Sequence, residues 1–189
     1  MANTAKYEFT GEVKTVTDSN YTERTVRRIR ALRDIEPPTK DGSVTKGDLG
    51  GWIESESNLS HSGECWVDED AVVMGNAVVK DNAYVCNRSV VDGNAIICDQ
   101  AAVDGNEVTV GEYAIICGNA SVLELAEVVG HVTVKGNVKV RGCAVIKDPY
   151  EITVESNSDD FTFDTEDFLE SNRVVIDGNI VIDSSIMVD

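Results

Sequence analysis

The sequence is poor in aromatic residues, in basic residues and in long apolar runs, and each shortage excludes a class of protein. Aromatic residues make up only 6% of the 189 residues, so the core has to be built from aliphatic side chains. Lysine and arginine number 16 against 34 acidic residues, and the net charge of −18 argues against direct binding to nucleic acid or to an anionic membrane. No apolar run approaches the roughly 20 residues of a transmembrane helix.

Paired cysteines and an N-terminal export signal are also missing. The five cysteines are an odd number and include no Cys-x-x-Cys pair, which favours reduced thiols over a disulfide framework or a zinc site. The first residues, MANTAKYEFTGEV, lack the apolar centre of a signal peptide. We therefore expect a cytoplasmic protein that holds no metal and no cofactor. The hydrophobic share of 42% is enough for a folded core.

A repeat of six residues dominates the sequence from Ala71 to about residue 149. Units such as AVVMGN, AVVKDN and SVVDGN follow one another, with one extra residue near Glu107. The first position is usually Ala or Ser, and the fifth is Gly, Asp, Asn or Glu. The third position is β-branched and aliphatic in every unit: Val73, Val79, Val85, Val91, Ile97, Val103, Val110, Ile116, Val122, Val128, Val134, Val140 and Ile146.

This repeat predicts an all-β solenoid. Six residues are three periods of a β-strand, whereas an amphipathic helix needs an apolar spacing near 3.6 residues. β-Branched side chains fit a pleated sheet, and a fifth position rich in Gly, Asn and Asp suits a corner with positive φ. Each unit is then a short strand plus a corner, whose apolar edge is buried only when successive coils stack. A β-sandwich would instead need longer strands, with turns every 8–12 residues or so.

Two resemblances to known families follow from these residues. The motif Val-x-Gly-Asn-Ala-x resembles the hexapeptide repeat of left-handed parallel β-helices, which implies a three-sided prism with three hexads per coil. The segments RIRALRDI (28–35) and GDLGGWIESESNLSHSGECWV (47–67) resemble the YdcK-like proteins, a phage-associated and bacterial family labelled as transferases on the strength of the repeat. The resemblance covers roughly residues 6–150 and carries over no catalytic residue. A phage origin would place the protein in the host cytoplasm.

The registers divide the chain into four regions. Residues 1–50 form an N-terminal capping region, in which the alternating stretches 7–16 and 25–33 predict a β-hairpin around the turn residues 18–20. Residues 51–150 form the β-helix, whose hexads give about five coils at ~4.8 Å per coil. Residues 151–173 break the register as an acidic, aromatic insertion. Residues 174–189 restore the register as a last coil.

The insertion at 151–173 is a candidate partner-binding arm. It places phenylalanine rings among carboxylates, which is more typical of an interaction arm than of a solvated linker. The alternative is that these rings fold back onto a face of the prism. The expected contact residues are Asp159, Asp160, Phe161, Phe163, Asp164, Asp167 and Phe168.

The second position of each hexad points outward, and in several coils it is apolar. An exposed strip of this kind is unusual on a soluble monomer, so something has to cover it. The candidates are the N-terminal hairpin, the 151–173 insertion or a second copy of the chain in a dimer or trimer. The residues of this docking or oligomer face are Val78, Ile96 and Ile115 on one wall, Val72 and Val90 on another, and Trp66 and Tyr84 on the third.

Two histidines are the candidates for catalysis. The resemblance to hexapeptide-repeat acyltransferases implies a histidine general base, often at a trimer interface. His61 falls in a third-position slot of the irregular first coil, and His131 falls at a corner where other units carry Asn, so both also fit structural roles. His61 and Cys65 could share a metal, but no second pair joins them. Cys98 and Cys117 occupy the same slot in adjacent coils, close enough for redox chemistry.

The sequence therefore favours a non-enzymatic, acidic β-solenoid that binds a protein partner with a basic surface and contacts neither nucleic acid nor membrane directly. Acidic residues are dense in 51–127 and 151–189, although charged walls also serve solubility alone. In its most specific form, the protein is a phage-encoded inhibitor that mimics nucleic acid on a host protein. The alternatives are an acyltransferase with a histidine base and a self-assembling structural protein.

Overall fold

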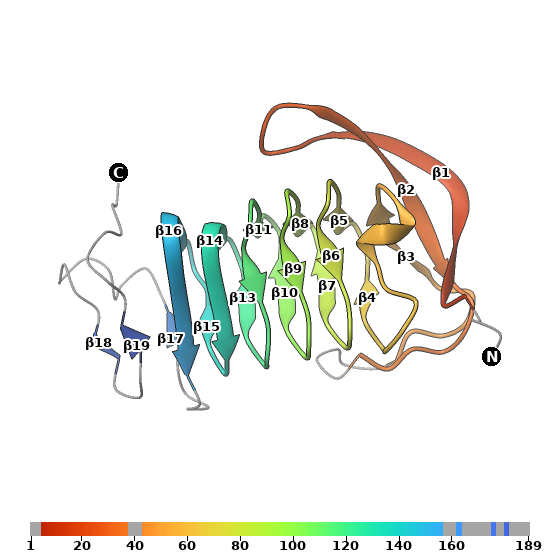
Figure 1. The fold of residues 1–189 in the computed structure, drawn as a ribbon. Coiled ribbons are helices and arrows are strands. Elements are labelled where there is room, and N and C mark those ends of the chain that lie inside the picture. The colour runs from red at the N-terminus through yellow and green to blue at the C-terminus, as the bar shows by residue number, and fades with distance from the viewer. Residues whose placement is uncertain (1–4, 38–42, 157–161, 164–174, 177–179, 182–189) are drawn as a thin grey trace.

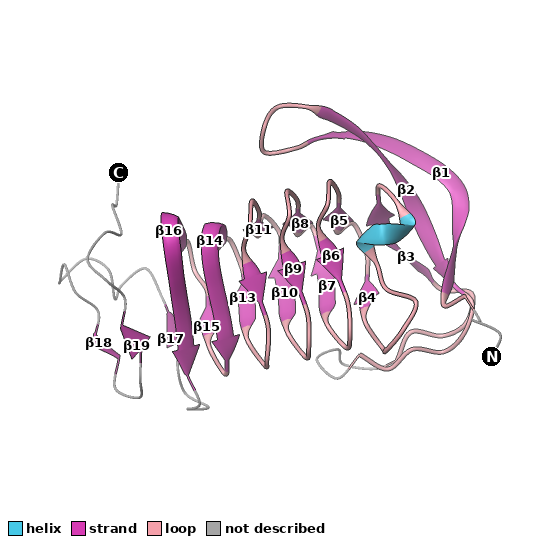
Figure 2. Ribbon diagram, viewed as in Figure 1, coloured by secondary structure: helices cyan, strands magenta, loops and turns pink. Residues whose placement is uncertain are grey.

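The structure, a computed structural model, describes residues 5–37 and 43–156, together with residues 162–163, 175–176 and 180–181. Regular structure in these residues is almost entirely β-strand, with one short 3-10 helix, η1 (Glu56–Asn58) (Figure 2). Among the described residues, no helix has the length and apolarity needed to span a membrane. The all-β prediction is confirmed.

Most of the strands are only two to four residues long, as a six-residue repeat requires. The strands are β1 (Tyr7–Thr17), β2 (Glu23–Ala31), β3 (Leu49–Ile53), β4 (Trp66–Val67), β5 (Val72–Val73), β6 (Val78–Val79), β7 (Tyr84–Asn87), β8 (Val90–Val91), β9 (Ile96–Ile97), β10 (Ala102–Gly105), β11 (Thr109–Val110), β12 (Ile115–Ile116), β13 (Ser121–Leu123), β14 (Glu127–Gly136), β15 (Lys139–Val140), β16 (Val145–Ser156), β17 (Thr162–Phe163), β18 (Val175–Ile176) and β19 (Ile180–Val181).

These short strands stack in parallel ladders and form a β-solenoid of about five turns (Figure 1). The first wall contains β3, β5, β8 and β11, and the second contains β6, β9 and β12. The third wall runs through β4, β7, β10, β13, β15 and β17. Strand β14 belongs to the first two walls, because its first half pairs with β11 and its second half with β12.

The register of the ladders explains the repeat. Val78 pairs with Ile96, and Tyr84 pairs with Ala102, so one turn takes three hexads. Ile96 then pairs with Ile115, one residue further on, which confirms the extra residue near Glu107. Each third-position side chain therefore stacks directly on its counterpart in the next turn.

The core is a column of aliphatic side chains along the axis of the solenoid. Every third-position residue from Val73 to Ile146 is at most 1% exposed, and the first-position residues from Ala71 to Ala144 are buried to the same degree. Burial of each valine or isoleucine side chain stabilises the fold by about 1.5–3 kcal/mol before entropy is counted. The fifth position turns the corner, with positive φ at residues such as Gly75, Gly93, Asp81 and Asp99.

The first coil departs from the expected register, and the prediction for His61 was wrong there. Leu59, not His61, pairs with Val79 and occupies the core slot with no exposed surface. The coil is therefore two residues longer than the later ones, and His61 lies half-buried outside the core. The physical reason is the apolar slot, which accepts leucine without a polar group to satisfy.

The N-terminal hairpin continues the first wall and covers its outer face. β1 and β2 pair antiparallel, β2 pairs antiparallel with β3, and β3 pairs in parallel with β5 (Figure 1). Val26 of β2 packs on Trp52, Val72 and Met74 in a small apolar cluster. The hairpin thus supplies intramolecular cover for one of the outward apolar strips.

The Gly50–Gly51 pair allows β3 to cross closely over the first coil. A Cβ atom at residue 50 would lie 2.5 Å from Trp66 Cζ2 and 2.8 Å from Ile29 Cγ1, and one at residue 51 would lie 2.7 Å from the Ala71 carbonyl oxygen. Only glycine leaves room for this approach. The close contact also helps to bury Trp66, which is fully inaccessible although its hexad position points outward.

Replacement of Ile97 by aspartate should unfold the protein, whereas the same change at the neighbouring Ile96 should be tolerated. Ile97 is fully buried among aliphatic side chains, so a carboxylate there has no partner, while Ile96 is only half-buried. We expect a loss of more than about 4 kcal/mol for Ile97→Asp and about 1 kcal/mol for Ile96→Asp in thermal or urea unfolding followed by circular dichroism. Equal losses for the two variants would show that the register is wrong.

Candidate functional site

One edge of the solenoid collects acidic side chains, and we call it the acidic edge. It consists of the corners that follow the third wall, after β4, β7, β10, β13 and β15, so its residues stack from turn to turn. Two basic residues, Arg88 and Arg141, lie on it. Its outward or partly exposed acids are Glu69, Asp70, Asp104, Glu107 and Glu124.

Some of these carboxylates support the fold and others are uncommitted. Glu124 Oε2 accepts a hydrogen bond from the backbone N–H of Gly142 in the next turn, at 2.9 Å, and the side-chain amide of Asn87 donates to Asp104. The carboxylates of Glu69, Asp70 and Glu107 make no hydrogen bond or ion pair within the part of the chain that the structure describes. Asp70 also interacts electrostatically with Lys14, so Glu69 and Glu107 are the acceptors best placed to meet an external cation.

A shallow hollow of about 550 Å³ lies on the acidic edge between two turns. Its lining combines the carboxylates of Asp104 and Glu124 with the aliphatic side chains of Leu123 and Leu125. Leu125 is 47% exposed, which is high for a leucine. Such a combination suits a lysine or arginine side chain, because its stem packs on leucine while its charged end reaches carboxylate.

The edge after the second wall carries less unbalanced charge. Its described corners contain Lys80 and Lys135 as well as Asp81 and Asp99. The acids there also serve the fold, since Asp99 Oδ2 accepts the backbone N–H of Gly118 at 2.9 Å. Within the described residues, the acidic edge therefore has a larger excess of acidic residues than the edge after the second wall.

The outward apolar residues form the expected ladders, but several of them are buried. Val72 pairs with Val90, Trp66 pairs with Tyr84, and Ile96 pairs with both Val78 and Ile115. Trp66, Tyr84 and Val72 are inaccessible to a partner, at 0%, 7% and 5% exposure. Val78, Val90, Ile96 and Ile115 remain half-buried, so the second wall keeps an apolar strip at its surface. A dimer or trimer through this strip stays a prediction.

His61 and His131 belong to different turns of the solenoid, and each of them stacks on a tyrosine. His61 stacks on Tyr7 at 4.3 Å between ring centroids, and His131 stacks on Tyr113 at 4.6 Å. His61 Nδ1 accepts a hydrogen bond from the backbone N–H of Lys6 at 3.2 Å, so this nitrogen is already engaged within the fold. His131 is exposed on a corner of the solenoid. Neither ring lines the hollow or the cleft described in this section.

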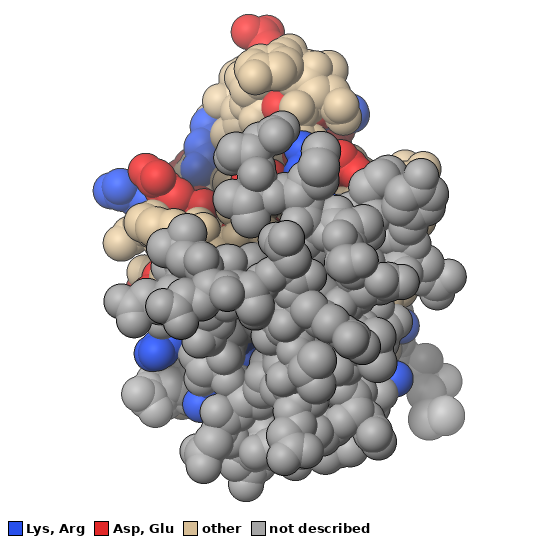
Figure 3. Space-filling view, turned by 90° about the vertical axis from the view of Figure 1, so that its left-hand side faces the viewer, with Lys and Arg blue, Asp and Glu red and all other residues tan. Residues whose placement is uncertain are grey.

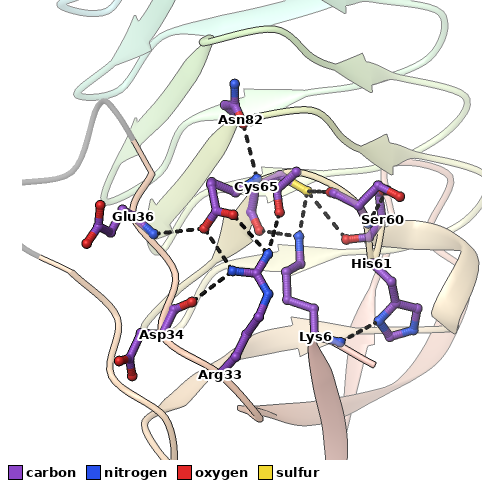
Figure 4. A network of polar contacts seen from close by, with 11 residues as sticks. Lys6, Arg33, Asp34, Glu36, Ser60, His61, Cys65 and Asn82 are labelled. Atoms are coloured by element: carbon purple, nitrogen blue, oxygen red, sulfur yellow. Dashed lines mark hydrogen bonds and ion pairs between the residues drawn. The ribbon is translucent and has the colours of Figure 1, made fainter. Parts of the chain in front are cut away.

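A network of polar contacts closes the N-terminal end of the solenoid, and we call it the terminal cap (Figure 4). Lys6 is fully buried, and its Nζ donates to the carbonyl oxygen of Cys65 at 2.7 Å and to Cys65 Sγ at 3.0 Å. Burial lowers the pKa of the Lys6 ammonium and raises the pKa of the Cys65 thiol. Tyr7 adds a hydrogen bond to the Leu59 carbonyl at 2.9 Å.

The outer part of the terminal cap is an ion pair between Arg33 and Glu64. The two guanidinium nitrogens lie 3.0 Å from the two carboxylate oxygens, in a bidentate arrangement. The backbone N–H of Glu36 also donates to Glu64 at 3.0 Å. Hydrogen bonding to Arg33 lowers the pKa of the Glu64 carboxyl.

One group of side chains has the spacing of metal ligands. Potential ligand atoms of Cys98, Asp99 and Cys117 all lie within 4.8 Å of one another on the edge after the second wall. It is the one such group of three within the described residues. Burial and the nearby Asp99 carboxylate raise the pKa of Cys98 to about 11, which disfavours the thiolate that a metal needs. The suggested pairing of His61 with Cys65 does not form, because Cys65 faces Lys6 and His61 faces Tyr7.

A cleft of about 320 Å³ lies where the tip of the hairpin meets the solenoid. The backbone N–H of Ser19 donates to Asp92 Oδ2 at 2.8 Å, while Asp92 Oδ1 is buried without a hydrogen-bond partner. Arg24 and Asp18 pair at 2.9 Å beside the cleft. These contacts fix the tip of the hairpin on the solenoid, a position that the sequence did not indicate.

The C-terminal end of the solenoid, which lies on the left of Figure 1, faces the viewer in Figure 3. The expected break in register does not begin at residue 151, because β16 stays paired with β14 as far as Ser156. The side chains of Asp159, Asp160, Phe161, Phe163, Asp164, Asp167 and Phe168 lie outside the described residues, so their role in a partner-binding arm stays a prediction. Lysine and arginine side chains are visible at the margins of this view. Among the basic residues between 128 and 150, Lys139, Arg141 and Lys147 are exposed.

Comparison with known proteins gives a limited similarity. No protein-family model matches the chain. The chain is similar to the "Uncharacterized acetyltransferase YdcK" of Escherichia coli (strain K12), with 34% identity over 61 residues. The match covers 32% of this chain and 19% of that protein, so the chain matches about a fifth of its relative's length. The expected similarity to YdcK is found, and the phage association stays a prediction.

Neutralisation of Glu64 should weaken the terminal cap in a pH-dependent way. The lowered pKa means that the ion pair stabilises the fold above the ordinary carboxyl range, near pH 4.5, and that this contribution is lost as pH falls through the folded-state pKa. Because both partners are partly exposed, we expect Glu64→Gln to cost only about 1 kcal/mol at pH 7. Urea unfolding should show this difference shrinking below about pH 4.

The control for this experiment is Glu36→Gln, since the Glu36 side chain is exposed and only its backbone joins the network. It should match the wild type at every pH. A Glu64→Gln difference that stays constant from pH 7 to pH 3 would contradict the ion-pair explanation.

Proposed function

We propose that the protein is a non-enzymatic binding scaffold whose acidic edge docks on the basic surface of a protein partner. The observation that carries this proposal is the hollow beside Leu125, where exposed aliphatic surface and carboxylates occur together. A merely solubilising surface needs the charge but has no need of the exposed leucine.

The stacking of turns supports the proposal by fixing the spacing of the charges. Successive turns lie about 4.8 Å apart, so acids in the same corner repeat at that spacing on a rigid frame. Acceptors carried on a rigid backbone cost little backbone entropy on binding. The same geometry supports the more specific form of the proposal, in which the protein inhibits a nucleic-acid-binding protein, since rows of carboxylates oppose lysine and arginine much as phosphates do.

Neutralisation of the acidic edge should slow association with the partner. The variant Glu69→Gln, Asp70→Asn, Glu107→Gln and Glu124→Gln removes four charges while keeping hydrogen-bonding groups. We expect association to slow by about tenfold at 0.15 M salt, because exposed charges act mainly on encounter rates. Leu125→Ser should instead raise the dissociation rate, because it removes apolar contact from the hollow. The measurement is surface plasmon resonance across a salt series, with the partner first isolated by pull-down from the native host.

The matched control removes the same number of charges from the hairpin region and the 3-10 helix. It is Glu12→Gln, Glu23→Gln, Glu36→Gln and Glu56→Gln, all of them exposed residues. If both quadruple variants slow association equally, net charge rather than the acidic edge governs binding. For the inhibitor form, duplex DNA should compete with the protein for its partner, and the absence of competition would contradict it.

An acyltransferase is the second candidate, favoured by the similarity to a protein named as an acetyltransferase. In this case a histidine would act as general base at an interface between copies of the chain. Exposed His131 fits that role better than His61, whose Nδ1 already accepts a hydrogen bond.

Binding of acetyl-coenzyme A separates the two functions. We expect isothermal titration calorimetry to detect no binding of acetyl-coenzyme A at concentrations of about 1 mM, well above typical enzyme KM values. His131→Ala should leave partner binding within about twofold of wild type, since the residue lies away from the acidic edge. Acetyl-coenzyme A binding together with acetyl transfer by a trimer, with the transfer lost in His131→Ala but kept in His61→Ala, would instead establish the acyltransferase.

A further inference from the structure

We propose that Lys6 and Cys65 form a redox modification site, at which an oxidant joins Lys6 Nζ and Cys65 Sγ through one oxygen atom in a nitrogen–oxygen–sulfur bridge. The two atoms lie 3.0 Å apart, and the same Nζ is held by the Cys65 carbonyl oxygen at 2.7 Å. The amine is therefore fixed against the sulfur by a second contact to the same residue. The site is independent of the acidic edge and of the function proposed for it.

The burial of Lys6 is hard to explain as an ordinary ion pair. Both residues are fully inaccessible, and within the described residues the hydrogen bonds of Nζ go to Cys65 alone, with no carboxylate. The Glu64 carboxylate acts on Lys6 only through space, so the desolvation caused by burial is the larger effect; it lowers the pKa of Lys6 and shifts the equilibrium toward the neutral amine. A neutral amine is nucleophilic, and it can also accept the proton of the adjacent thiol.

The separation of the two atoms favours a bridge through oxygen over a direct bond. A nitrogen–sulfur bond would require Nζ and Sγ to approach by more than an ångström, in a cap where Lys6 is also held at its backbone by His61. One inserted oxygen spans nearly the present distance. The oxygen-bridged product therefore fits the packed cap with little movement.

The reaction balances with hydrogen peroxide as oxidant. One peroxide converts the Cys65 thiol to a sulfenic acid: the S–O bond forms, the O–O bond breaks, and the thiol proton passes through the Lys6 amine to the departing hydroxide, which leaves as water. A second peroxide converts the amine to a hydroxylamine and releases another water. The hydroxylamine oxygen then attacks the sulfenyl sulfur, whose hydroxyl group leaves as a third water. Nitrogen and sulfur together lose four electrons, which the two peroxide molecules accept.

Access to the pair is through the outer part of the terminal cap. Arg33 and His61 lie beside it in Figure 4, and Glu64 pairs with Arg33 at 3.0 Å; all three residues are only half-buried. Hydrogen peroxide is small and uncharged, and local openings at the start of β1 admit it. The product would tie β1 covalently to the first coil, across the 59 residues that separate Lys6 from Cys65.

Mass spectrometry of the peroxide-treated full chain tests the proposal. After alkylation of remaining thiols and digestion without reductant, we expect peptides containing Lys6 and Cys65 to be joined. Their combined mass should exceed the sum of the unmodified peptides by about 14 Da, for one oxygen gained and two hydrogens lost. Dithiothreitol should remove the link. The oxidised protein should also melt several degrees higher than the reduced protein, because a cross-link restricts the unfolded chain.

Three variants make the result specific. Lys6→Arg keeps a buried donor but lacks the amine, and Cys65→Ser lacks the sulfur, so neither should form the link or gain in melting temperature on oxidation. Cys86→Ser removes another buried thiol and should leave the link unchanged. Circular dichroism checks that each variant is folded. If a variant does not fold, the mass spectrum of the oxidised wild-type protein decides the question alone. Cys65 recovered only as alkylated thiol, as unlinked sulfur acids or in a link lacking the oxygen would overturn the proposal.

Discussion

The hydrogen bonds between successive turns are the constraint on which the rest of the structure depends. The N–H of Val72 donates to the Ser89 carbonyl at 2.9 Å, and that of Val90 donates to the Val108 carbonyl at 2.8 Å, so each turn is satisfied only by the next. The strands that stack on one wall therefore have to stay in register from turn to turn. The β-branched third position and small first position follow from that requirement, because only such a column packs without gaps at the spacing of parallel strands.

The same constraint makes the N-terminal end of the solenoid a problem that the sequence has to solve. The first turn has no preceding turn to cover its core, and an open end would expose both apolar surface and unpaired backbone groups. The protein answers with β3 and the hairpin along one wall and with the terminal cap beneath the first coil. Lys6 combines both needs, since its aliphatic stem covers the core while its Nζ satisfies the Cys65 carbonyl.

The fold could be read from the sequence because it repeats, and the cap could not because it does not. The column from Val73 to Ile146 is evident from spacing alone. The contact between Lys6 and Cys65 joins residues 59 positions apart with no periodic signal. The sequence also failed to show that Leu59, rather than His61, occupies the core slot of the first coil. The two additional residues of that coil shift its register. Only the general preference of an apolar slot for leucine could have indicated it.

The acidic character of the chain likewise separates into two parts once the turns are stacked. Some corner acids are structural, since Asp99 and Glu124 accept backbone N–H groups of the following turn. Composition counts these together with Glu69, Asp70 and Glu107, which have no such contact within the described residues. A net charge of −18 therefore overstates the surface available to a partner. What distinguishes the acidic edge is the coincidence of uncommitted carboxylates with the exposed side chain of Leu125, and that coincidence is a property of the stacked structure rather than of the composition.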